Sequence, residues 1–97
     1  PVYWYTFSAP LKLVIDKFYS FCVAKLDFSG KKSALISACG DPGLETFDGI
    51  RFSYQKTIDL LGIESVGEVM IDNVHGVGEI RTTEGEALAA ELAEKFL

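Results

Sequence analysis

The 97-residue sequence has few of the residues that mark specialised protein classes: it contains two cysteines, three prolines, one histidine and one methionine. Cys22 and Cys39 lie far apart and belong neither to a CxxC motif nor to a Cys/His cluster. This pattern gives no support to a disulfide framework, a zinc site or a thioredoxin-like redox pair. Free thiols in a reducing compartment are the expected state.

Long apolar runs and an excess of basic residues are also missing. Lys12, Asp16 and Lys17 interrupt the most apolar region, so no stretch reaches the roughly 18 to 20 residues that a membrane span requires. Nine Lys and Arg against fourteen Asp and Glu give a net charge of −5, which repels polyphosphates and anionic lipids. The front of the chain has no basic signal-peptide region. We therefore expect a cytoplasmic protein that binds neither nucleic acid nor membranes.

What is present is a globular composition. Hydrophobic residues make up 48% of the chain, aromatics 12% and charged residues 24%, which excludes disordered and low-complexity classes. A chain of this length supports one core, so residues 1–97 are expected to belong to a single domain. The aromatic run at its start, without an initiator Met, is expected to be an internal part of a longer protein.

Apolar residues at 3.6-residue spacing predict three helices. The first covers about 9–24, with Ser8 as its cap, and the second covers 47–61. Near the end of the chain, Thr83 and Glu86 have the spacing of a capping box, which indicates the start of a third helix.

Two strands separate these helices. The nearly uncharged run 33–39 is typical of a strand buried on both faces, and 66–72 predicts a second strand that Gly67 and Glu68 weaken. The order loop, helix, strand, helix, strand, helix indicates an α/β fold with parallel strands. Two strands are too few to shield such a sheet, so we expect a homo-oligomer, a swapped dimer or a complex with a complementing N-terminal half.

The opening residues 1–12, PVYWYTFSAPLK, carry a family resemblance. Together with Asp16 and Lys17 they resemble the flavin-ring loop of flavodoxin-like NAD(P)H-dependent FMN reductases, in which a Pro-(small)-Tyr-aromatic stretch leads to a small residue and a Lys, and then to Asp-Arg. Lys17 stands where Arg is usual. Residues 38–42 and 47–51 resemble the continuation of that family, so the likeness extends over the whole chain.

The resemblance implies a flavodoxin-like three-layer α/β/α domain of which this chain is the C-terminal part. Nothing here corresponds to the family's first strands or to its Ser/Gly-rich phosphate loop. The implied cofactor is FMN, the implied hydride donor is NAD(P)H, and the full-length protein is implied to be an oxidoreductase. The implied cofactor-binding residues are Pro1, Val2, Tyr3, Trp4, Tyr5, Thr6, Phe7 and Ser8 in the first loop and Cys39, Gly40 and Asp41 in the second.

The residue types suit a flavin on physical grounds as well. Flat aromatic side chains such as Tyr3, Trp4 and Tyr5 stack against a wide apolar ring. A loop that leaves a parallel strand and enters a helix offers backbone N–H groups to the polar edge of that ring. Donors there stabilise the reduced, partly anionic flavin and raise its potential.

Three alternatives remain open at this stage. The parent protein is either an enzyme or a non-catalytic electron-transfer module with the same loops, or the chain is a structural fragment that binds no cofactor. Without the resemblance, three consecutive aromatics are more often core or strand residues. Cys39 is more often a small buried hydrophobe than a reactive thiol, and His75 is more often a solvated turn residue than a ligand.

Overall fold

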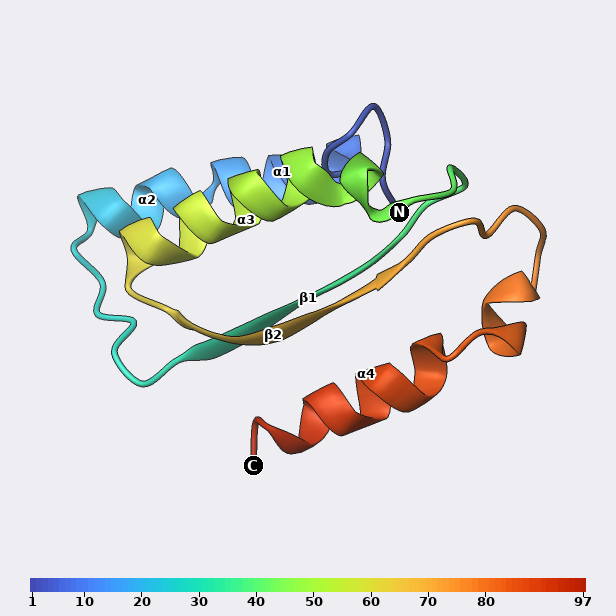
Figure 1. The fold of residues 1–97 in the computed structure, drawn as a ribbon. Coiled ribbons are helices and arrows are strands. Elements are labelled where there is room, and N and C mark those ends of the chain that lie inside the picture. Colours follow the sequence, from blue (N-terminus) through green and yellow to red (C-terminus); the bar gives the residue numbers. More distant parts are fainter.

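The computed structural model describes residues 1–97 as a two-stranded parallel sheet with helices on both faces (Figure 1). The strands are β1 (Lys32–Ala38) and β2 (Glu64–Ile71). The α-helices are α1 (Ala9–Asp16), α2 (Phe18–Val23), α3 (Asp48–Leu61) and α4 (Gly85–Glu94), and the 3₁₀ helices are η1 (Leu44–Phe47) and η2 (Glu79–Thr82). The first three α-helices lie over one face and α4 lies under the other, which confirms the expected α/β class and the parallel strands.

The continuous helix predicted over 9–24 is wrong, because it is divided at Lys17. The Lys17 N–H donates to Val14 O (3.1 Å) and the Ser20 N–H donates to Lys17 O (3.1 Å), so the chain tightens to a three-residue spacing there. Ser8 does occupy the N-cap of α1, but its side chain makes no capping hydrogen bond. The two short helices follow one another above the sheet.

The register of the sheet contains a β-bulge. Ser33 pairs with Ser65, whereas Leu35 pairs with Glu68, so β2 has one residue more than β1 in this interval. Gly67 lies in the bulge with φ of +140°, and a Cβ at that position would lie 2.9 Å from Leu92 Cδ1. The glycine that indicated a weak strand is thus the residue that lets β2 bend over α4, and β2 begins earlier than predicted.

Burial of β1 on both faces was predicted and is wrong. Leu35 and Ser37 are buried toward the helices above, but Ile36, on the opposite face, is 61% exposed. The reason is the position of α4, which packs against β2 and leaves the lower face of β1 uncovered.

The core lies between β1 and the upper helices. It consists of Phe7, Leu35, Cys39, Phe47 and Ile50. The helix predicted over 47–61 is confirmed by η1 and α3, which end at Gly62 in the left-handed conformation (φ +69°) that suits a helix stop. Only 11 of the 97 residues are buried, so large parts of the sheet and of the helices on its two faces have no packing partner.

The predicted capping box is not formed. The N-cap of α4 is Glu84, and Thr83 instead closes η2 by donating its Oγ1 hydroxyl to Ile80 O (2.6 Å) while accepting the Gly85 N–H (3.1 Å). The Thr83 hydroxyl therefore accepts the N–H of the first residue of α4, Gly85, and not the Glu86 N–H that a capping box would supply. None of the helices reaches the length and apolarity of a transmembrane segment.

Candidate functional site

A cleft of about 280 Å³ lies where the chain leaves the C-terminal end of β1. The aromatic loop at the start of the chain forms one wall, and the loop after β1 forms the other. Both loops follow from the parallel topology, which places strand ends and helix starts at the same edge of a sheet. The lining residues are Val2, Trp4, Tyr5, Cys39, Gly40, Asp41 and Thr46.

The first wall is a tight two-residue turn. The Tyr3 N–H donates to Thr6 O (3.1 Å) and the Thr6 N–H donates to Tyr3 O (3.2 Å), while Trp4 and Tyr5 between them have φ of +49° and +68°. Two successive positive φ angles define a type I′ turn, which normally contains Asn-Gly. A side chain with a Cβ costs about 1 kcal/mol or more in this conformation, so the turn is strained at two successive positions.

Three contacts hold the strained turn in place. The Val2 N–H donates to Ala38 O (3.0 Å) at the end of β1, and the Phe7 side chain is buried in the core. On the other side, the Tyr5 carbonyl lies directly against Gly49 in the first turn of α3, where a Cβ would overlap the carbonyl oxygen. Gly49 is therefore required for the close approach of the turn to α3.

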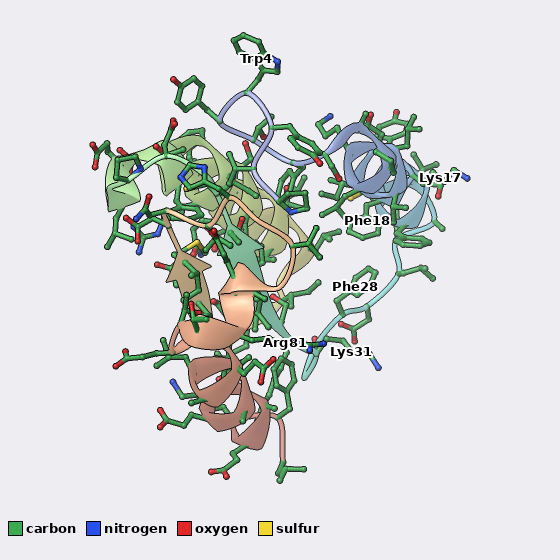
Figure 2. The ribbon with its side chains drawn as sticks, turned by 90° about the vertical axis from the view of Figure 1, so that its right-hand side faces the viewer. Trp4, Lys17, Phe18, Phe28, Lys31 and Arg81 are labelled. Carbon is green, nitrogen blue, oxygen red and sulfur yellow. The ribbon has the colours of Figure 1, made fainter.

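The turn presents its aromatic side chains to solvent at the rim of the cleft. Trp4 is 93% exposed and projects away from the body of the protein (Figure 2), and Tyr3 and Tyr5 are each 59% exposed. The alternative that these aromatics are core residues is therefore wrong for all three. Phe7, in contrast, is a core residue. The family resemblance had implied that it contacts the cofactor, but it does not line the cleft.

The second wall is tied to the end of β2 by hydrogen bonds. Cys39 donates its N–H to Ile71 O (3.0 Å) and accepts the Val74 N–H (3.0 Å), and the Asn73 N–H donates to Asp41 O (3.1 Å). Further along, the Gly43 N–H donates to Asp72 Oδ2 (2.6 Å). This wall is thus fixed by the sheet.

The charges in the cleft lining favour binding of an uncharged group over an anion. Asp41 is the one charged side chain in the lining, and no Lys or Arg is present to bind a phosphate. No cluster of three His, Cys, Asp or Glu side chains that could bind a metal ion exists in the chain. A flat neutral group between the aromatic rim and the second wall suits this lining better than an anion does.

Cys39 lines the cleft as a buried side chain and does not have the properties of a nucleophile. Its Sγ donates to Asp41 O (3.4 Å), and burial, reinforced by the negative charge of Asp72, raises the pKa of the thiol above its ordinary value. A thiol of raised pKa is a poor nucleophile near neutral pH. This electrostatic setting favours the interpretation of Cys39 as a buried small residue.

The structure divides the implied site residues into two groups. Val2, Trp4, Tyr5, Cys39, Gly40 and Asp41 meet at the cleft. The others lie elsewhere: Pro1 lines a groove on the α4 side, Tyr3 and Thr6 form the base of the turn, Phe7 is in the core and Ser8 precedes α1.

Sequence reasoning missed Thr46 and gave His75 little weight, and both lie near the cleft. Thr46 in η1 lines it and is buried; its one sequence signal is its position shortly after the Asp41-Pro42-Gly43 turn. The His75 ring lies against the second wall, because a Cβ at Gly40 would lie 3.3 Å from its Nδ1. The His75 Nε2 is 3.2 Å from Asn73 Oδ1, which orients the ring.

Comparisons of the chain with protein-family models, with curated proteins and with solved structures found no match.

Proposed function

We propose that the cleft binds the ring system of FMN, and that the chain is the C-terminal part of a flavodoxin-like NAD(P)H-dependent FMN reductase. The observation that carries the proposal is the meeting of Trp4 and Tyr5 with Cys39, Gly40 and Asp41 around one cleft. These two segments are far apart in the sequence, and both belong to the stretches that resemble the family's ring-binding loops.

The chemistry of the lining supports a flavin ring. The exposed faces of Trp4 and Tyr5 offer the stacking surface that a tricyclic ring requires. The absence of a cation from the lining agrees with a site for the ring alone, since the phosphate loop of the family has no counterpart in these residues. The affinity of the 97-residue chain alone for FMN should therefore be weak, because these residues contact only the ring and not the phosphate.

Under this proposal the protein orients the flavin and adjusts its reduction potential, and the flavin carries the electrons. Donors that face the polar edge of the ring would stabilise its reduced form, and the aromatic rim would leave one ring face accessible to a nicotinamide. A non-catalytic electron-transfer module would have the same loops. Anaerobic addition of NADH or NADPH to the flavin-loaded parent protein separates the two, because bleaching of the flavin absorbance occurs only in the reductase.

A matched pair of variants tests the site itself. We expect Trp4→Ala to weaken FMN binding by about fivefold to about 150-fold, because stacking contributes roughly 1 to 3 kcal/mol per ring. Tyr19→Ala, which removes an exposed aromatic from α2, away from the cleft, should leave binding unchanged. The measurement is the quenching of FMN fluorescence on titration with each protein.

Cys39→Ala completes the test. It should weaken binding less than Trp4→Ala does, because the buried thiol contributes shape and no stacking surface. If Trp4→Ala and Tyr19→Ala bind FMN equally well, or if the Cys39 variant loses more affinity than the Trp4 variant, the ring does not lie in this cleft.

A further inference from the structure

Thr46 carries a buried hydroxyl that the fold does not use. The residue lies in η1 and is 9% exposed. The hydroxyls of Thr57, Thr82 and Thr83 each donate to a backbone carbonyl at 2.8 Å or less. Thr46 Oγ1, by contrast, has no hydrogen-bond partner in the chain. Because a buried hydroxyl without a partner opposes folding, packing alone does not account for a threonine at this position.

The Thr46 hydroxyl opens onto the cleft. Ser37 Oγ is the one polar side-chain atom in the chain that is both fully enclosed and without a partner. Thr46 Oγ1 also lacks a partner, so it retains a small accessible surface, and the space that Thr46 borders is the cleft. A group that enters the cleft therefore meets an unpaired hydroxyl.

The segment that carries Thr46 is fixed from three sides. Before it, the Gly43 N–H donates to Asp72 Oδ2 (2.6 Å) at the end of β2. The next residue, Phe47, is fully buried in the core, and Gly49 lies directly against the backbone of the aromatic turn. A threonine side chain also has few rotamers, because it is branched at Cβ. The hydroxyl is thus held in place before a ligand binds, which is what a specificity-determining group requires.

The hydroxyl differs from most polar groups of the lining because it both donates and accepts a hydrogen bond. The Asp41 carboxylate only accepts, the Trp4 indole N–H only donates, and Cys39 Sγ already donates to Asp41 O. The Tyr5 phenol has the same capacity, but its side chain is 59% exposed at the rim. Thr46 therefore supplies the one enclosed side chain of the lining that is free to change its hydrogen-bonding role.

The N5 atom of a flavin ring changes its role in the same way. It accepts a hydrogen bond in the oxidised ring, and it carries a hydrogen and donates in the reduced ring. A fixed N–H donor matches only the first state, and a carboxylate matches only the second. A hydroxyl matches both, because its hydrogen rotates to suit the partner.

We propose that the Thr46 hydroxyl hydrogen-bonds N5 of the flavin ring and makes the cleft specific for a ring with nitrogen at that position. The inference rests on the proposed function, since it requires the ring to lie in the cleft. It adds a side-chain contact that the family resemblance did not imply.

The test uses the full 97-residue chain and two variants of one residue. Thr46→Val removes the hydroxyl and keeps the branched shape, and Thr46→Ser keeps the hydroxyl and removes the methyl group. The two ligands are FMN and 5-deaza-FMN, in which a C–H group replaces N5. Affinity is measured from quenching of the emission of Trp4, the only tryptophan in the chain, and stability from the midpoint of urea unfolding.

We expect Thr46→Val to bind FMN about fivefold more weakly than the parent chain, the effect of one net hydrogen bond, and Thr46→Ser to stay within about twofold of the parent. The parent chain should bind 5-deaza-FMN about fivefold more weakly than FMN, whereas Thr46→Val should bind the two ligands about equally. Because the hydroxyl has no partner in the fold, Thr46→Val should unfold at the same or a higher urea concentration.

Equal FMN affinity of Thr46→Val and the parent chain overturns the inference, and the proposed function still stands if Trp4→Ala loses affinity. A Thr46→Val variant that loses the same factor for both ligands also overturns it, because the hydroxyl then contacts a different atom of the ring. So does a lower urea midpoint of Thr46→Val, because the hydroxyl then serves the fold. If FMN quenches the Trp4 emission in none of these chains, the proposed function itself fails, and the inference fails with it.

Discussion

The two walls of the cleft differ in what holds their backbone in place. The wall after β1 is held by the sheet, with four hydrogen bonds joining residues 39–43 to residues 71–74. The wall from Tyr3 to Thr6 has two hydrogen bonds of its own, two left-handed aromatic residues and an almost fully exposed Trp4. One wall is fixed by the sheet and anchored by the buried Cys39, and the other is strained and exposed.

This difference sets the aromatic turn apart as the wall whose residues folding stability alone does not explain. Exposed Trp and Tyr in a turn that would accept Asn-Gly without strain are unfavourable for folding alone. Strain of this kind persists only where the surrounding structure imposes it, and it is concentrated at functional positions. The second wall, by contrast, is explained by the sheet that it extends.

The largest expected effect comes from Gly49→Ala. In an ordinary helix this change stabilises by about 1 kcal/mol through helix propensity. Here the added Cβ would overlap the Tyr5 carbonyl oxygen, so the turn must move. Because the overlapped atom belongs to the backbone, we expect an overpacking cost of about 4 kcal/mol, above the typical range, and hence a net destabilisation of about 3 kcal/mol, measured by urea unfolding. Gln55→Ala on the exposed face of α3 is the control, and equal stability of the two variants would refute the contact.

The next effect is of opposite sign. Replacing Trp4 by Asn and Tyr5 by Gly supplies the residues that a type I′ turn prefers, and relief of two strained positions should raise the free energy of unfolding by about 2 kcal/mol. Under the proposed function the same double variant should lose FMN affinity at least about tenfold. A double variant that is no more stable than the parent would show that the turn is not strained.

The smallest effect concerns the wall that follows β1. Asp72→Asn keeps an oxygen that accepts the Gly43 N–H but removes the charge that helps to raise the pKa of the Cys39 thiol. The pKa should fall toward its ordinary value, so Cys39 should react faster with iodoacetamide at fixed pH. Exposed Cys22 provides the internal reference, since its rate should not change. An unchanged ratio of the two rates would show that the Asp72 charge does not contribute to the raised pKa of Cys39.

The contrast between the walls also explains what sequence reasoning found and missed. Periodicity located α3 and its end at Gly62, because the face made by Phe47, Ile50 and Ile58 is buried. It missed the division at Lys17, because the apolar spacing continues through a local tightening of the backbone. The strand at β1 was found, but its burial was overstated, since composition carries no information about where α4 packs.

The candidate cleft shows the same division. The aromatic run and the loop after β1 were identified from the residues that carry the family resemblance, and the structure brings six of those residues together. The left-handed turn at Trp4 and Tyr5 was not foreseen, because aromatic residues give no signal for positive φ. Gly49 was missed for a related reason: its role depends on a carbonyl more than forty positions away in the sequence, at Tyr5.

The parallel pairing of β1 with β2 has a kinetic consequence. The two strands are joined through η1 and α3, so their ladder closes only after the intervening helix has formed and folded back. Until then the apolar segment 33–39 is open to pairing with other nascent chains. Slow synthesis at low temperature should therefore increase the yield of correctly folded chains by giving this crossover time to close.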